Sequence, residues 1–130
     1  MKRVLFVCVH NSGRSQMATA FMERLANGVV AVDSAGTVPS DAVNPVVVDA
    51  MKEKGLDVSE GKPKLLTQDM ADAADRIITM GCSTEETCPA TFVPTEDWGL
   101  EDPAGKAIEE VRAIRDEVQL RVKWLLAELV

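Results

Sequence analysis

Hydrophobic residues along this chain fall into short continuous runs separated by stretches in which they recur every three or four positions. Three runs are rich in β-branched residues, as in strands buried on both faces, and they cover residues 3–7, 29–36 and 75–80. A fourth strand, of edge type, is predicted within residues 92–98, between Pro94 and Trp98. The pattern therefore predicts four strands.

The intervening stretches have helical spacing. One helix is predicted from Ser15 to the Asn27-Gly28 pair, and a second from Asn44-Pro45 to Lys54, with Gly55 ending it. A long amphipathic helix is predicted near the C-terminus from the apolar positions Ile108, Val111, Ile114, Val118, Val122 and Leu125. Strands that alternate with helices indicate an α/β fold, in which a four-stranded parallel sheet is flanked by helices on both faces.

Length and charge limit the classes of function. The 130 residues fit a single domain spanning residues 1–130, and the net charge of −7 argues against non-specific nucleic-acid binding. No apolar run approaches the length of a membrane span, and the basic N-terminus lacks the features of a signal peptide. We expect a cytoplasmic monomer that binds neither membranes nor nucleic acids. An anionic substrate would need a local positive site.

The chain has three cysteines and one histidine. An odd, small number of cysteines does not suggest a disulfide framework, so we consider metal ligands, nucleophiles and redox groups. Five residues separate Cys82 from Cys88, which is not the usual spacing of a zinc knuckle. His10 lies in the loop that is predicted to bind an anion, so it is a poor candidate for a zinc ligand. We expect no metal and no cofactor.

The segment CVHNSGR, residues 8–14, joins the end of the first predicted strand to the first helix. Its small residues let successive backbone N–H groups point inward, which together with a helix N-terminus makes a nest for a tetrahedral oxyanion. The guanidinium of Arg14 adds two parallel N–H donors for two oxygens of the anion. The positive potential of the nest and of Arg14 also favours the thiolate form of Cys8. The pattern predicts covalent catalysis on phosphate-like anions. The predicted binding residues are Val9, His10, Asn11, Ser12, Gly13, Arg14 and Ser15.

The spacing of Cys8 and Arg14 alone is weak evidence, and the alternative is a buried strand-end thiol next to a solvated helix arginine. We assign His10 no catalytic role, because it can simply occupy a permissive loop position. Asp102, before Pro103, is the candidate general acid, with Glu101 as its rival.

Two further cysteines follow the third predicted strand. Cys82 would lie at the same edge of the sheet as Cys8, and a reductase, unlike a hydrolase, needs such a thiol. The alternative is that Cys82 and Cys88 are unconnected thiols.

Six segments together resemble the thioredoxin-coupled arsenate reductases, which are built on the low-molecular-weight protein tyrosine phosphatase fold. The segments are FVCVHNSGRSQMA, VDSAGT, NPVVVDAMKEKGLDVS, DRIITMGC with the later CP, WGLEDPAGK and VRAIRDEVQLRV. They span nearly the whole chain in the order found in that family. The resemblance implies that arsenate is the substrate, with phosphate or sulfate as mimics, and that thioredoxin is the electron donor.

The resemblance also implies a role for each matching residue. Cys8 is the nucleophile, Arg14 clamps the oxyanion, Asn11 and Ser15 order the loop and stabilise the thiolate, and Asp102 is the general acid. Cys82 attacks Cys8 and releases arsenite, and Cys88 then attacks Cys82, so that thioredoxin reduces a Cys82–Cys88 disulfide. The loop between these two cysteines is one residue shorter than in well-known members. Potassium-binding members use a glutamate where this chain has Thr19, and we expect no potassium site.

Three alternatives remain open. A tyrosine phosphatase could use the same nest, although tyrosines typical of those enzymes are missing after Asp102-Pro103 and the chain has no tyrosine. A non-catalytic oxyanion-binding or redox-sensing module is another possibility, which the joint presence of Cys8, Arg14 and Asp102 disfavours. A low-molecular-weight thiol with a glutaredoxin-like protein could replace thioredoxin, although three cysteines favour thioredoxin.

Overall fold

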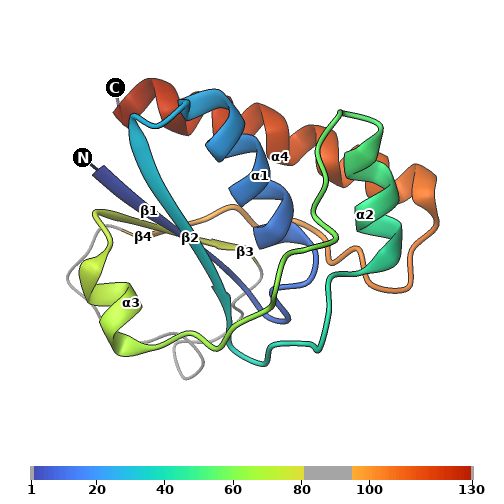
Figure 1. Cartoon of the computed structure of the whole chain (residues 1–130), viewed down its shortest axis with the longest axis horizontal. Coiled ribbons are helices and arrows are strands. Elements are labelled where there is room, and N and C mark those ends of the chain that lie inside the picture. Colours follow the sequence, from blue (N-terminus) through green and yellow to red (C-terminus); the bar gives the residue numbers. More distant parts are fainter. Residues whose placement is uncertain (1, 81–94, 130) are drawn as a thin grey trace.

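A four-stranded sheet forms the centre of the computed structural model, which describes residues 2–80 and 95–129 (Figure 1). All neighbouring strands are parallel, and the strand order is β2-β1-β3-β4. This confirms the parallel sheet predicted from the sequence. The strands are β1 (Lys2–Cys8), β2 (Val30–Gly36), β3 (Arg76–Met80) and β4 (Thr95–Asp97).

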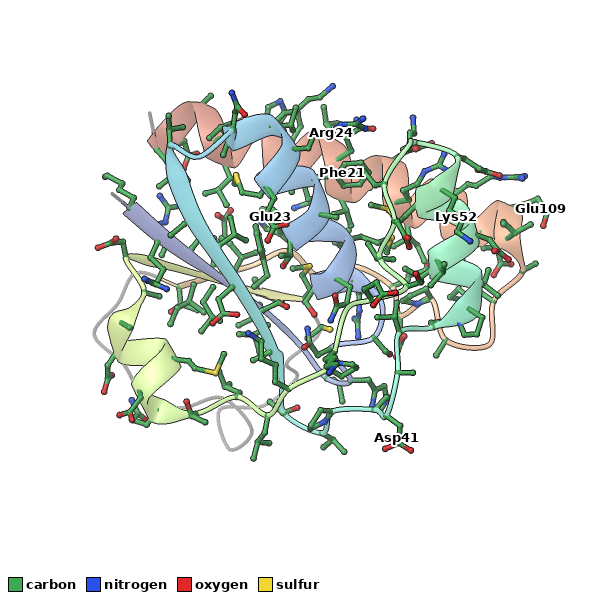
Figure 2. All side chains as sticks on the ribbon, viewed as in Figure 1. Phe21, Glu23, Arg24, Asp41, Lys52 and Glu109 are labelled. Atoms are coloured by element: carbon green, nitrogen blue, oxygen red, sulfur yellow. The ribbon has the colours of Figure 1, made fainter. Side chains whose placement is uncertain are left out.

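The helices cover both faces of the sheet, as predicted. The helices α1, α2 and α4 enclose the larger core cluster on one face, whereas α3 packs on the other face over a smaller cluster (Figure 1). Phe21 lies on the side of α1 that faces α4 (Figure 2) and is 2% exposed. The helices are α1 (Arg14–Ala26), α2 (Pro45–Lys52), α3 (Gln68–Ala73) and α4 (Ile108–Leu129).

The central strand β1 explains why its residues form an unbroken apolar run. Val4, Phe6 and Cys8 belong to the larger cluster, while Leu5 and Val7 belong to the smaller one. Successive side chains of a strand point to opposite faces, so both sets must be apolar in a doubly covered sheet. This packing fixes the end of β1, and with it Cys8, in the middle of the molecule.

The structure differs from the sequence prediction at two helices. The helix predicted to reach Lys54 ends at Lys52, because the chain turns through Gly55 at φ +76° and Leu56 N–H donates back to Met51. The helix α3 was not predicted at all; it has only six residues and is capped by the Thr67 side chain. Among the described residues, none of the helices combines the length and apolarity needed to cross a membrane.

Candidate active site

Cys8 ends β1 at the carboxyl edge of the sheet, and residues 9–13 lead directly into α1. Its neighbours in register are Gly36, the last residue of β2, and Met80, the last residue of β3. The connection after β1 leads through α1 to β2 on one side, and the connection after β2 leads to β3 on the other side of β1. The strand order therefore reverses at β1, and open parallel sheets bind ligands at such a point. The fold therefore places the predicted loop at a typical binding position.

The backbone of the loop is turned so that its carbonyls face away from its centre. Each carbonyl from Cys8 to Gly13 accepts a hydrogen bond, and in a trans peptide the following N–H points the opposite way. The N–H groups of residues 9–14 are thus gathered on the other side, as a nest for an anion requires. The carbonyls of residues 8, 9 and 10 accept from the N–H groups of Thr37, Val38 and Ser40, in that order. The Asn11 carbonyl accepts from the side chain of Gln16. The carbonyls of residues 12 and 13 accept from the N–H groups of Asn44 and Met17.

The thiol of Cys8 is 2% exposed and lies 2.9 Å from Ser15 Oγ. Asn11 Nδ2 donates to the same Ser15 oxygen at 2.6 Å. That bond occupies a lone pair of the hydroxyl and leaves its proton free to point at sulfur. Asn11 supports this contact in the left-handed region at φ +51°, a conformation that asparagine tolerates better than most residues.

Arg14 is only 5% exposed, so it is not the solvated helix residue of the alternative interpretation. Its NH1 donates to the carbonyl of Leu100 at 3.0 Å, and its NH2 lies 3.7 Å from Asp102 Oδ2. Its Nε is buried and has no hydrogen-bond partner within the described residues. A buried guanidinium donor is costly to leave without an acceptor. An oxyanion is the kind of ligand that would satisfy it.

Asp102 is held beside the arginine by its own turn and by Pro103. Asp102 Oδ1 accepts the Ala104 N–H at 2.9 Å, while its other oxygen faces Arg14. Pro103 is buried against Gly13, where an added Cβ would stand 2.6 Å from the proline ring. The rival acid Glu101 has a 76% exposed side chain and pairs with Lys106 at 3.4 Å. The geometry therefore favours Asp102 over Glu101.

The remaining predicted loop residues share one degree of burial. Val9, His10 and Ser12 are half-buried. His10 Nδ1 is 3.0 Å from the carbonyl of Val38, so the ring tethers the loop to the segment after β2. That segment also carries the exposed Asp41, at the edge of the view in Figure 2. No catalytic role for His10 is needed to explain its position.

Cys82 and Cys88 lie outside the described residues, and their predicted roles stay predictions. β3 ends at Met80, next to Cys8 in the sheet register. Within the described ranges, no group of three or more His, Cys, Asp or Glu side chains could hold a metal ion.

Two contributors to the site were not predicted from the sequence. Gly36 packs against the loop so closely that an added Cβ would lie 2.6 Å from the Val9 carbonyl oxygen. Lys64 N–H donates to Asn11 Oδ1 at 3.0 Å across 53 positions of sequence. The glycine at the end of a strand was a visible hint of close backbone approach, whereas a backbone donor can come from any residue type.

Comparisons with known proteins point to one family. The family model for low molecular weight phosphotyrosine protein phosphatases matches residues 3–130. A Halobacterium salinarum protein, provisionally named an arsenate reductase, is 44% identical over 128 residues, which are 95% of this chain and 89% of that protein. A glutaredoxin arsenate reductase of Synechocystis is 39% identical over 132 residues, 99% of each chain.

A solved structure extends the likeness to three dimensions. The thioredoxin-dependent arsenate reductase of Corynebacterium glutamicum superposes with a TM-score of 0.83 at 38% identity. The match covers 98% of this chain and 61% of that one.

Proposed function

The chain belongs to the low molecular weight phosphotyrosine protein phosphatase family and, within it, to the arsenate reductases, and we propose that it reduces arsenate to arsenite through Cys8. The observation that carries this proposal is the buried Arg14 Nε, a donor without a protein acceptor in the described part of the chain, beside a backbone nest that ends at a buried thiol. Arsenate is a tetrahedral oxyanion that suits both groups.

The first step joins Cys8 to arsenic. The thiolate attacks the arsenic atom of arsenate, a sulfur–arsenic bond forms, and one oxygen leaves as water after taking a proton from Asp102. The loop N–H groups and the guanidinium hold the remaining oxygens, whose negative charge would otherwise repel the thiolate. Arg14 positions both partners, because it binds the anion and lies 3.7 Å from the acid.

The second step reduces the arsenic. The Cys82 thiolate attacks the Cys8 sulfur, the sulfur–arsenic bond breaks, and its electron pair reduces arsenic from the +5 to the +3 state as arsenite leaves. Cys88 then attacks Cys82, which frees Cys8 and leaves a Cys82–Cys88 disulfide. The attack by Cys82 is supported by the sheet register, because β3 ends beside Cys8 at Met80, two residues before Cys82 in the sequence.

Thioredoxin is the proposed electron donor. Two electrons from its dithiol reopen the Cys82–Cys88 disulfide and complete the cycle. The similar Corynebacterium enzyme is named as thioredoxin-dependent, and the similar Synechocystis enzyme is named for glutaredoxin. We favour thioredoxin because the chain keeps three cysteines. The proposal places the protein in the cytoplasm, where thiols stay reduced, as a single domain over residues 1–130 that acts as a monomer.

Hydrolysis of phosphate monoesters is the second candidate function. The family model is that of phosphatases, and the nest does not distinguish phosphate from arsenate by shape. The segment after Asp102-Pro103 is Ala104-Gly105, both exposed, which offers no aromatic wall for a tyrosine side chain. A weak phosphatase side activity is consistent with this site.

The test measures arsenate-dependent NADPH oxidation with thioredoxin and thioredoxin reductase, and separately with glutathione, glutaredoxin and glutathione reductase. Hydrolysis of an aryl phosphate is followed under the same conditions. Turnover with the thioredoxin system supports the full proposal. Turnover only with glutathione and glutaredoxin would show that these, and not thioredoxin, are the electron donors, and that Cys88 is not needed. Steady aryl phosphate hydrolysis without arsenate turnover would contradict the proposal.

A further inference from the structure

A chain of three hydrogen bonds links the backbone of Lys64 to the sulfur of Cys8. Lys64 N–H donates to Asn11 Oδ1 at 3.0 Å, Asn11 Nδ2 lies 2.6 Å from Ser15 Oγ, and Ser15 Oγ lies 2.9 Å from Cys8 Sγ. We propose that the backbone N–H of Lys64 is a positioning group that sets the direction of this chain and so keeps Cys8 ready as a nucleophile. The importance of that readiness for arsenate reduction rests on the proposed function.

The direction of the chain follows from what each group can donate. A backbone N–H can only donate, so the side-chain atom of Asn11 that faces Lys64 must be the carbonyl oxygen. The amide nitrogen then has to face Ser15 and donate to its oxygen. The Ser15 hydroxyl proton is left to point at Cys8, which is the direction that stabilises a thiolate.

The opposite orientation of Asn11 shows what Lys64 prevents. With its amide flipped, Asn11 would place two donors against each other at Lys64 and turn its oxygen to Ser15. Ser15 would then donate to Asn11, and only lone pairs would face the sulfur of Cys8. Such an arrangement opposes a thiolate, because an anion next to lone pairs is repelled.

Lys64 can hold this orientation because its own peptide is fixed in place. The segment of residues 61–66 pairs with the end of β2, where Gly36 N–H donates to the Lys64 carbonyl and Leu66 N–H donates to the Gly36 carbonyl, both at 2.8 Å. The Lys64 ammonium also forms an ion pair and hydrogen bond with Asp33 of β2. The position of the Lys64 N–H is therefore set by β2, which is itself paired with β1.

The test compares Lys64→Pro with Lys64→Ala. Both variants lose the ammonium and its ion pair with Asp33, but only proline lacks the N–H that reaches Asn11. The readout is the rate at which iodoacetamide alkylates Cys8 across pH, in a Cys82→Ser/Cys88→Ser background where Cys8 is the sole thiol. We expect K64P to react about tenfold more slowly than K64A below the pH of full thiolate formation, the size expected for one lost charge-assisted hydrogen bond.

A second background separates positioning from general distortion. In Ser15→Ala, the last link of the chain is missing, so the two Lys64 variants should alkylate within about twofold of each other. Equal rates of K64P and K64A with Ser15 present would overturn the proposal. An undiminished difference in the Ser15→Ala background would also overturn it. Arsenate is absent from this assay, so its result is independent of whether the protein proves to be an arsenate reductase.

A further measurement needs no proline. In the ¹⁵N-labelled Cys82→Ser/Cys88→Ser protein, the Lys64 amide signal and the Asn11 side-chain amide signals are followed by NMR while Cys8 is titrated. We expect both to shift with the same midpoint as the ultraviolet absorbance of the Cys8 thiolate, and the Lys64 shift to vanish in the Ser15→Ala variant. A Lys64 signal that ignores the ionisation of Cys8 would contradict the proposal, even if K64P failed to fold.

Discussion

Replacing Gly36 with alanine tests whether the end of β2 shapes the anion nest. The new Cβ would stand 2.6 Å from the Val9 carbonyl oxygen, 2.9 Å from the Asn11 nitrogen and 3.0 Å from the Asn11 Cβ. Two of these contacts are with backbone atoms, and the Val9 carbonyl is also held by the Val38 N–H at 2.8 Å. The nest itself must therefore move if Gly36→Ala is to fold.

The size of the effect can be worked from these contacts. Moving the Val9 oxygen from 2.6 Å to an ordinary contact requires a shift of about half an ångström or more. Overpacking costs about 1–3 kcal/mol, and the lower entropy of alanine in the unfolded chain offsets about 0.5–1 kcal/mol, so a net loss of stability of about 1–2 kcal/mol is expected. Misplacement of the nest should cost kcat/KM much more, about 10²-fold.

The assay combines urea denaturation with steady-state arsenate turnover. Gly28→Ala serves as the comparator, because Gly28 follows the C-terminal end of α1, away from the nest, and an added Cβ there meets nothing within 4 Å. Its cost is backbone strain at φ +90°, so we expect G28A to lose stability but to keep kcat/KM close to that of the wild type. A G36A enzyme with wild-type kcat/KM and stability would refute the view that β2 shapes the nest.

Three further predictions concern single side chains. Arg14→Lys keeps a positive charge but loses the planar fork and Nε, so kcat/KM for arsenate should fall about 10²-fold or more, measured by steady-state kinetics. Asp102→Asn should slow formation of the first arsenic–cysteine species about 10²-fold or more in rapid-quench experiments, while phosphate binds at least as tightly because a negative charge is removed. Arg112 and Arg115 hydrogen-bond Glu53 and lower its pKa to about 2, so the contribution of Glu53 to stability is complete above about pH 4.5 and is lost as the pH falls toward 2. The difference in Tm between wild type and Glu53→Gln should accordingly shrink over that range, and a constant difference would contradict this assignment.

The sheet could be predicted from sequence because its central strands are buried on both faces. The unbroken apolar run of β1 is typical of a strand covered on both faces. The spacing of Met17, Phe21 and Met22 favours one helical face, and all three belong to the larger cluster, whereas Leu25 is 37% exposed. The helix α3 could not be predicted in the same way, since six residues give too little periodicity and its start depends on the Thr67 cap. Short elements are defined by tertiary contacts, here with the smaller core cluster.

The candidate site shows the same division between local and distant determinants. Cys8, Arg14 and their nest lie within one short segment, so their spacing could be interpreted together with the strand before it, the helix after it and the small residues between them. Asp102 is a candidate acid only because the first motif predicts an anion site, and the sequence leaves Glu101 as its rival. The place of Asp102 beside Arg14 depends on a distant contact, the packing of Pro103 against Gly13. The Lys64 N–H lies 53 positions from Asn11 and belongs to the backbone, which carries no residue-specific signal in a sequence.

A single turnover in the absence of any electron donor tests the central claim most directly. Fully reduced wild-type protein, with three thiols per chain, is mixed with excess arsenate, and arsenite and remaining thiols are counted. The account predicts one arsenite per chain, a fall from three thiols to one, and a Cys82–Cys88 disulfide in the mass spectrum of the digest. Three unchanged thiols and no arsenite, with aryl phosphate still hydrolysed, would contradict it.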